Sequence, residues 1–298
     1  MIVSNLIGGL GNQLFQFACG HAVAQRHGVP LQVAVDQFAG YTLHQGYELQ
    51  RVFTVDAPVA DDAALRECLG LWRRPLMRGV LEKLRPGVSR SGRVAFEPAG
   101  NFWPGIDGVG PDAYLHGYWQ SERYFEAAGQ TLVQQLRFRQ PTSAENARWL
   151  DRIAEGTSSV SVHVRRGDYI SNPKNRGIYA ECTAAYYRAA LDHIRQAHSG
   201  VRCFVFSDDI AWAREALAEY ADAAAFIDHN RGAESYNDLR LMSHCQHHVI
   251  ANSTFSWWAA WLGEHTQQRA NKIIVAPQRW YVQPGRGVDL VPARWTRL

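Results

Sequence analysis

Beyond Pro141 the chain alternates regularly between apolar strand patterns and helical patterns, and this alternation constrains the fold more than any other feature. The expected strands are 159–165, 202–206, 224–227, 247–251 and 272–276, and the expected helices are 143–154, 183–197, 211–220, 235–245 and 255–262. Strands separated by helices of this length indicate a parallel sheet with right-handed crossover connections. We therefore expect an α/β domain in the second half of the chain.

A β-α-β unit opens the chain. Residues 2–7 and 31–35 are expected strands, and an apolar-periodic segment from residue 14 to about 26 is the helix between them. Further elements are expected at 61–69 and 76–84 (helical) and at 113–117 (strand). Because 298 residues exceed one typical domain, we predict two Rossmann-like domains, residues 1–150 and 151–298, with parallel sheets facing a central cleft.

Composition excludes several classes of protein. With 46% hydrophobic and 20% charged residues the chain resembles an ordinary globular protein, and a net charge of +3 gives no reason to expect a nucleic-acid partner. The five cysteines include no C-x-x-C pair, which is typical of reduced thiols in the cytoplasm. No signal segment and no apolar run near the length of a membrane span is apparent, so we expect a cytoplasmic protein.

Charge is concentrated between residues 71 and 93. Seven basic residues against one acidic residue give this segment +6, and they are Arg73, Arg74, Arg78, Lys83, Arg85, Arg90 and Arg93 against Glu82. A solvated basic face is the simplest interpretation. The alternative is a weak contact of Arg73–Arg93 with the inner face of a membrane.

Two arginines and a carboxylate follow directly where the strand at 159–165 ends. Ligands bind outside the carboxyl ends of strands in open α/β sheets, so Arg165, Arg166 and Asp168 are expected to face a crevice. The planar guanidinium matches phosphate oxygens two at a time, which favours a diphosphate site with a carboxylate beside it. A surface salt bridge is the alternative interpretation.

Two polar turns have the same topology, a strand end followed by a helix start. The first turn contains Gly9, Gly11, Asn12 and Gln13, and the second contains Asn252, Ser253, Thr254 and Phe255. Unpaired N–H groups at a helix start suit an anion. The first turn fails as a dinucleotide fingerprint because Leu14 occupies the third glycine position, although Asp36 would suit a ribose. A plain tight turn and a helix cap remain open as simpler interpretations.

The sequence offers little for a metal. The cluster at residues 244–248 contains three histidines and one cysteine but has no second group of ligands at a recognisable spacing. No two aspartates are separated by one residue, so arginine must neutralise any leaving diphosphate.

With these motifs in order, the chain resembles the bacterial α-1,2-fucosyltransferase family, glycosyltransferase family 11. The matching segments are GGLGNQLFQF at 8–17, GYWQSERYF at 117–125, HVRRGDYISNP at 163–173, FSDD at 206–209 and ANSTFSWWAAW at 251–261. The resemblance implies a GT-B fold with an N-terminal acceptor domain and a C-terminal domain for GDP-β-L-fucose. It also implies inverting, metal-independent transfer of fucose to the 2-hydroxyl of a galactose-type acceptor, in an oligosaccharide or a lipid-linked glycan.

The resemblance also implies roles for individual residues. Arg165 would bind the β-phosphate, His163 and Arg166 would position it and the nucleoside, and the two polar turns would close on the diphosphate. Asp208 would contact the nucleoside, and Trp119 and Tyr124 would contact the acceptor. Asp168 is the expected general base with Glu181 as the second candidate, and a dissociative reaction without a side-chain base is the alternative.

Two functions of other classes remain open at this point. An NAD-dependent oxidoreductase would use the first glycine turn with Asp36. A non-catalytic carbohydrate-binding protein would keep aromatic platforms and need no paired arginines.

Overall fold

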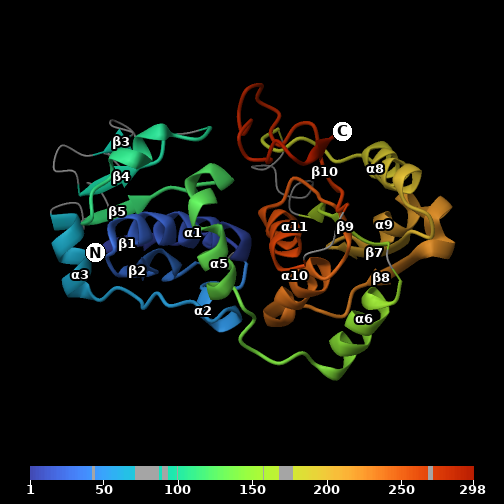
Figure 1. The fold of residues 1–298 in the computed structure, drawn as a ribbon, viewed down its shortest axis with the longest axis horizontal. Helices are drawn as coiled ribbons and strands as arrows, with labels where there is room; N and C mark the ends of the chain where they lie inside the picture. Colours follow the sequence, from blue (N-terminus) through green and yellow to red (C-terminus); the bar gives the residue numbers. More distant parts are fainter. Residues whose placement is uncertain are drawn as a thin grey trace. The chain divides into compact units, whose positions relative to one another are not determined.

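The computed structural model describes residues 1–41, 44–70, 93–98, 100–156, 158–167, 177–267 and 271–298, and the backbone alone at 87–88. These residues divide into two compact units. Unit 1 comprises Met1–Arg139 and Gly287–Pro292, and unit 2 comprises Gln140–Arg286 and Ala293–Leu298. Each unit contains its own sheet with helices packed around it (Figure 1), which confirms the predicted α/β fold class.

Unit 1 is built on a sheet with the strand order β2-β1-β5-β4-β3. The described elements are β1 (Ile2–Asn5), α1 (Leu10–His27), β2 (Leu31–Ala34), η1 (Asp36–Phe38), α2 (Leu49–Val52), α3 (Asp62–Leu69), β3 (Gly87–Val88), β4 (Val94–Phe96), η3 (Pro104–Gly108), β5 (Ala113–His116), η4 (Glu122–Tyr124), η5 (Glu126–Ala128) and α5 (Gly129–Gln135). All pairs are parallel except β3 with β4. The sequence pattern did not predict β3 or β4.

Helix α1 starts at Leu10, four residues before the start expected from the sequence. The apolar pattern begins at Leu14, but the backbone already turns at Gly9, so Gly11, Asn12 and Gln13 lie in the first helical turn. Close contact with β1 depends on Gly20, where an added Cβ would lie 2.8 Å from Cβ of Ser4. The loop expected to bind anions in unit 1 is therefore the start of a buried helix.

Unit 2 is built on a sheet with the order β11-β10-β9-β6-β7-β8, in which every pair is parallel. The described elements are α6 (Ala144–Ala154), β6 (Ser159–Val164), α8 (Ala184–Ala197), β7 (Arg202–Ser207), α9 (Ile210–Ala216), η6 (Ala218–Ala223), β8 (Ala224–Ile227), η7 (Gly232–Glu234), α10 (Tyr236–Ser243), β9 (His247–Val249), α11 (Thr254–Thr266), β10 (Ile274–Ala276) and β11 (Thr296–Arg297). The strand–helix alternation predicted for this half is confirmed. Among the described strands of unit 2, the C-terminal edge strand β11 has no counterpart in the sequence pattern.

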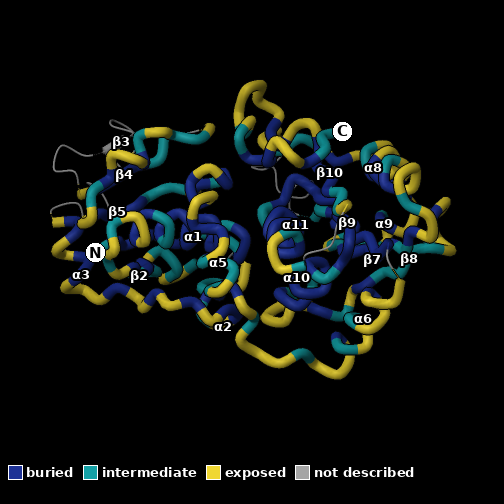
Figure 2. The backbone as a smooth tube through the Cα atoms, viewed as in Figure 1, coloured by how far each residue is buried: buried dark blue, intermediate teal, exposed yellow. Residues whose placement is uncertain are grey.

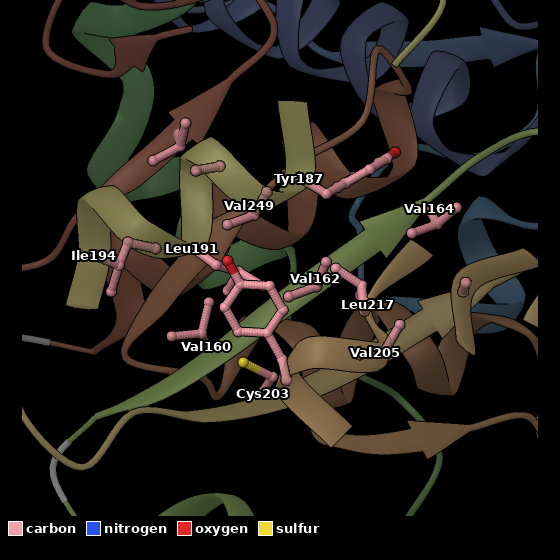
Figure 3. Packing of buried hydrophobic residues seen from close by; sticks show 14 of the residues in the cluster. Val160, Val162, Val164, Tyr187, Leu191, Ile194, Cys203, Val205, Leu217 and Val249 are labelled. Carbon is pink, nitrogen blue, oxygen red and sulfur yellow. The ribbon is translucent and has the colours of Figure 1, made fainter. Parts of the chain in front are cut away.

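Strand β6 lies in the middle of this sheet and is buried on both faces. On one face Val160, Val162 and Val164 pack with residues of α8 that include Tyr187 and Leu191 (Figure 3). On the other face the hydroxyl of Ser161 bonds Nδ1 of His248 at 2.8 Å. Alternation of valine with polar residues therefore does not mark a solvent face here, because a central parallel strand is covered on both sides.

The division between the units falls at Arg139 and Gln140 and not at residue 150. The buried guanidinium of Arg240 on α10 donates to the carbonyl of Gln140 at 2.7 Å and to the hydroxyl of Thr142 at 3.0 Å. These contacts attach the connecting segment, most of which is exposed (Figure 2), to unit 2. Helix α6 follows that segment and therefore belongs to unit 2.

A buried amide and carboxyl network fixes α6 in unit 2. Asn146 and Asn230 exchange two hydrogen bonds of 2.9 and 3.0 Å, and Asn230 also donates to Asp238 at 2.8 Å. Burial is the main cause that raises the pKa of Asp238 to about 7, and the nearby charge of Asp228 adds to the shift. The folded protein thus holds a proton on Asp238 more tightly than the unfolded chain does.

We expect Asp238→Asn to stabilise the protein at pH 8 and to leave its stability nearly unchanged at pH 4. A carboxyl with a raised pKa loses stabilisation as pH rises between its ordinary value and about 7, whereas the amide stays neutral and still accepts from Asn230. Each pKa unit corresponds to about 1.4 kcal/mol, so the gain is at most about 4 kcal/mol, and less where water screens the carboxylate. Urea unfolding of both proteins at several pH values measures this, and an equal difference at every pH would contradict it.

Among the helices of the described residues, none combines the length and apolar character that a membrane crossing requires. The expected helix at 76–84 and the basic residues from Arg73 to Arg90 lie outside the described residues. The predicted membrane contact of this segment is therefore left as a prediction.

Candidate active site

The carboxyl ends of three neighbouring strands, β9, β6 and β7, meet at one edge of the unit 2 sheet. His163 lies near the end of β6 and residues 165–167 follow that strand, while Asp208 follows β7. Asn252 and Ser253 come between β9 and α11, and Thr254 and Phe255 open α11. The sheet order therefore brings together the arginine motif, one aspartate and one of the two polar turns predicted from the sequence.

Asp208 holds the turn that follows β6. Its carboxylate accepts from the backbone N–H of Arg166 at 2.9 Å and of Gly167 at 3.1 Å, and it pairs with Nη1 of Arg165 at 3.1 Å. A Cβ at Gly167 would lie 2.9 Å from Oδ2 of Asp208, so this approach requires glycine. The carboxylate of Asp208 thus orients Arg165 and the turn, and its contact with a nucleoside stays a prediction.

Arg166 is fixed by three neighbours in unit 2. Its guanidinium lies 4.0 Å above the ring of Trp212, its Nη1 pairs with Glu181 at 3.2 Å, and its Nε is 3.9 Å from Asp209. Glu181, the second candidate for the general base, is thus engaged with a cation. Of the two arginines, Arg165 has the more exposed side chain, at 28% against 16%.

His163 is buried at the end of β6, 6.0 Å from the ring of Phe255 between ring centroids. Burial lowers its pKa to about 4, opposed by Asp208 and assisted by Arg165. The imidazole is therefore neutral at pH 7 and adds no positive charge to the site. Within the described residues its Nδ1 is buried and has no hydrogen-bond partner.

Helix α11 begins at this edge of the sheet without a side-chain cap. Ser253 occupies the N-cap position, but its hydroxyl makes no capping hydrogen bond, and the first helical bond runs from the N–H of Trp257 to the carbonyl of Ser253. Among the described residues, the N–H groups of Thr254 and Phe255 are thus left for another acceptor. A helix of 13 residues also adds partial positive charge at this end.

The side chain of Asn252 does not lie beside the free N–H groups at the start of α11. It is buried, and its amide nitrogen donates to the carbonyls of Ala180 at 2.5 Å and Trp280 at 3.2 Å. The predicted contact of Asn252 with the donor is thus replaced by a structural role, because both amide hydrogens hold neighbouring backbone segments.

In unit 1, the turn after β1 contains both open and buried groups. Gly8 has a φ of +85°, and a Cβ there would lie 2.6 Å from Nδ2 of Asn12. Asn12 is half-buried and accepts from Nε2 of Gln120 at 2.8 Å. Gly9, at the N-cap of α1, has no side chain to cap the helix, and the N–H groups of Asn12 and Gln13 donate to its carbonyl. Among the described residues, the N–H groups of Leu10 and Gly11 are left for an acceptor.

Gln13 is fully buried and makes four hydrogen bonds within unit 1. Its amide nitrogen donates to the carbonyls of Gly8 and Gly46 at 2.9 and 2.8 Å, and its oxygen accepts from the N–H groups of Glu48 and Leu49 at 2.9 and 3.2 Å. The predicted contact with diphosphate is therefore not available to Gln13, because this side chain joins the glycine turn to the loop at 46–49.

The two rings expected to contact the acceptor are both buried. Trp119 is 0% exposed and packs edge-on against Tyr124 at 5.2 Å, and Tyr124 is 6% exposed. The hydroxyl of Tyr124 accepts from the N–H of Trp103 at 2.8 Å. Neither ring presents a face to a sugar, and the sequence interpretation of Trp119 and Tyr124 as platforms needs correction.

Glu97 was not predicted and proves central to this part of unit 1. Its Oε2 accepts from the N–H groups of Tyr118 and Trp119 at 2.7 and 2.8 Å, and burial raises its pKa. Trp119 has a φ of 54°, so the carboxylate stabilises an unusual backbone conformation. No sequence signal marked Glu97, because the sequence pattern predicted no strand at β4, which it follows.

Two further predictions concern Asp168 and metal ions. Asp168 lies outside the described residues, so its predicted role as general base is not addressed by the geometry. In the described part of the chain, no group of three or more histidine, cysteine, aspartate or glutamate side chains is arranged to hold a metal ion. That includes the cluster at residues 244–248.

Comparison with known proteins identifies the family. The alpha-1,2-colitosyltransferase of Escherichia coli is 29% identical over 100% of this chain and 99% of its own length. The O-antigen biosynthesis glycosyltransferase WbnK of Escherichia coli is 37% identical over 43% of this chain and 41% of its own. The solved structure of the fucosyltransferase NodZ from Bradyrhizobium covers 87% of this chain and 92% of its own at 14% identity, with a TM-score of 0.48. The model of glycosyl transferase family 11 matches residues 108–284, more than half of the chain, and the chain therefore belongs to this family of glycosyltransferases.

Proposed function

We propose that this enzyme transfers L-fucose from GDP-β-L-fucose to the 2-hydroxyl of a galactoside, with inversion at the anomeric carbon. The observation that supports this best is the pairing of Arg165 with Asp208 beside the uncapped start of α11. Together they supply a permanent cation and a set of backbone N–H donors at one sheet edge, as a diphosphate leaving group requires. Unit 2 is the proposed donor side and unit 1 the proposed acceptor side.

In the proposed reaction the fucosyl C–O bond breaks as the 2-hydroxyl oxygen of the acceptor attacks the opposite face of the sugar. Negative charge develops on the β-phosphate and positive charge on the sugar ring. Arg165 and the N–H groups of Thr254 and Phe255 are oriented before the reaction, so they stabilise the developing charge without rearrangement. His163, whose pKa of about 4 leaves it neutral at pH 7, adds no charge to this edge of the sheet.

The attacking hydroxyl must also lose its proton, and we propose Asp168 as the acceptor of that proton. Asp168→Asn is then expected to lower turnover strongly while GDP affinity stays within a few fold, because an amide keeps the shape but cannot take the proton. Turnover assays beside calorimetry with GDP measure both quantities. Loss of GDP affinity together with rate would instead give Asp168 a bracing role, and retention of both would support a dissociative reaction without this base.

Activity is expected to survive EDTA. Arginine and helix N–H groups are the proposed neutralisers of the leaving diphosphate, and the described residues offer no metal-ligand cluster. GDP release measured after exhaustive chelation should match the untreated enzyme. An absolute requirement for added Mg²⁺ or Mn²⁺ would contradict the metal-free mechanism.

The full-length relative, named for colitose, makes a second donor worth testing. Colitose is the 3-deoxy form of L-fucose, so GDP-fucose and GDP-colitose differ by one hydroxyl. A direct comparison of kcat/KM for both donors with lactose decides which sugar is transferred. Preference for GDP-colitose would replace fucose in our proposal and leave the linkage and the leaving group unchanged.

Product analysis tests the proposal as a whole. Incubation with GDP-fucose and lactose should release GDP and give a trisaccharide whose NMR spectrum shows an α-linked fucose on the 2-position of galactose. A β-linkage would overturn inversion, and substitution at another position would overturn the acceptor hydroxyl. NAD(H) should not bind, since the enzyme is a glycosyltransferase and not an oxidoreductase.

We also propose a cytoplasmic location and a soluble or lipid-linked glycan as acceptor. All five cysteines lie in the described part of the chain, are buried and form no disulfide, as is common in a reducing compartment.

A further inference from the structure

At the carboxyl edge of the unit 1 sheet, two aromatic loops flank the glycine turn. The strand order β2-β1-β5 places the loop after β2 on one side of the turn that follows β1, and the loop after β5 on the other side. The first loop contributes Tyr41 and His44, and the second contributes Tyr118. Ligands bind at this edge in α/β sheets, so the location itself indicates a binding surface.

Tyr41 and His44 lie close together, and Tyr118 lies within electrostatic range of Tyr41. The rings of Tyr41 and His44 are 6.4 Å apart between centroids, and the ring of His44 lies 3.3 Å from where a Cβ of Gly9 would be. The Tyr118 hydroxyl is near enough to Tyr41 to contribute to its raised pKa, after burial. Tyr118 is 49% exposed, and His44 is also exposed.

Backbone strain occurs in the same two loops. In the described chain three non-glycine residues have a positive φ, namely His44 at 57°, Trp119 at 54° and Asn271 at 59°. Two of the three therefore lie at this edge, one in each aromatic loop. Such conformations persist only where the surrounding structure enforces them, and they are concentrated at functional sites.

Both loops are held by buried polar side chains. Gln13 fixes the first loop through Gly46, Glu48 and Leu49. Glu97 fixes the second through the N–H groups of Tyr118 and Trp119, and Gln16 adds a bond to the carbonyl of Gly117 at 3.2 Å. Exposed aromatic rings on rigid, braced loops lose little entropy when a ligand covers them.

Polar groups suited to sugar hydroxyls lie beside the rings. Asn12 in the glycine turn and Gln120, two residues beyond Tyr118, share a hydrogen bond of 2.8 Å and are both half-buried. Carbohydrates combine an apolar face of C–H groups with a rim of hydroxyls. An aromatic face with amides next to it matches both parts.

We propose that Tyr118, Tyr41 and His44 form the acceptor platform of this enzyme and take the apolar face of a terminal β-galactoside. This inference rests on the proposed function of this protein, the transfer of a sugar to a galactoside. It replaces Trp119 and Tyr124, which are buried, with neighbouring rings that have exposed faces. Trp119 then serves to anchor the turn that presents Tyr118.

The platform is tested by lactose binding and by kinetics. Saturation-transfer NMR with lactose should show sugar protons receiving magnetisation from the wild-type protein and from Tyr118→Phe, which keeps the ring. Tyr118→Ala and Tyr41→Ala should each lose most of that signal and raise the KM for lactose about tenfold, while kcat changes less. Val59→Ala removes an exposed apolar side chain elsewhere in unit 1 and should change neither quantity.

GDP binding separates this inference from the proposed function. Calorimetry should give the same GDP affinity for Tyr118→Ala and wild type, because Tyr118 is not among the proposed contacts of the nucleotide. If the wild-type protein binds lactose through Tyr118 but transfers no sugar from GDP-fucose, the platform stands and the proposed reaction fails. Undiminished lactose binding and an unchanged KM in both alanine variants would overturn the platform, as would the absence of any lactose signal in the wild-type protein.

Discussion

Replacement of Arg165 by lysine is expected to lower kcat at least about 100-fold although the charge is kept, since loss of one preoriented transition-state donor has an effect of about this size. Lysine is a point donor on a flexible chain and cannot make a two-pronged contact with a phosphate. The structure adds a second reason, because the guanidinium of Arg165 is oriented by Asp208 at 3.1 Å. A lysine ammonium would be drawn to the same carboxylate without reaching the diphosphate.

Binding of GDP and GMP to Arg165→Lys locates the contact. If Arg165 binds the β-phosphate, GDP affinity should fall while GMP affinity changes little, so that the ratio of the two affinities shrinks. Arg188→Lys is the matched control, since Arg188 forms an exposed pair with Glu219 at 3.4 Å and pairs of this kind contribute little. Turnover close to wild type in Arg165→Lys would remove Arg165 from the role of leaving-group stabiliser.

The secondary structure of unit 2 could be predicted from the sequence, and the reason is its regularity. A helix separates each strand from β6 to β10 from the next, and this regular alternation leaves few alternatives. In unit 1 the pattern failed at β4, Val94–Phe96, which lies in a stretch of sequence without such alternation. Without that strand Glu97 could not be placed at a sheet edge.

The location of the candidate site could also be predicted, but the roles of its amides could not. Asn252 and Gln13 stand in polar turns at strand ends, as ligand contacts do. Their hydrogen bonds go instead to backbone groups such as the carbonyl of Ala180 and the N–H of Glu48, which are distant in sequence. A sequence pattern shows which residues stand at a turn but not which way a side chain points.

For the aromatic residues, the sequence could not show which of two neighbouring rings is exposed. Tyr118 and Trp119 are neighbours in sequence, and the family resemblance implied Trp119 as the acceptor contact. The positive φ of Trp119 rotates its side chain into the protein, where it packs on Tyr124, and leaves Tyr118 exposed. Backbone conformation at one residue thus decides which ring a ligand can reach, and no propensity predicts it.

Asp208→Asn is expected to weaken GDP binding about tenfold or more and to lower kcat together with it, as truncation of one partner of a hydrogen-bonded charge pair does. The carboxylate accepts from three donors, the N–H groups of Arg166 and Gly167 and Nη1 of Arg165. An amide would replace one accepting oxygen with a donor that faces another donor, and the ion pair with Arg165 would be lost. Asp222→Asn alters an exposed carboxylate in unit 2 and should leave both quantities unchanged.

A double-mutant cycle with Arg165→Lys shows whether Asp208 acts through that arginine. If Asp208 only orients Arg165 and its turn, the fold-loss of kcat and GDP affinity in the double variant should be well below the product of the two single fold-losses. The second substitution then removes a group that has already lost its function. Direct contact between Asp208 and the nucleoside, as the sequence had suggested, would make the two losses multiply. Asp208→Glu refines the distinction, because glutamate keeps the negative charge but has a longer side chain. The carboxylate of Asp208 lies so close to Gly167 that a Cβ added at Gly167 would be 2.9 Å from Oδ2, and the longer side chain cannot keep this approach.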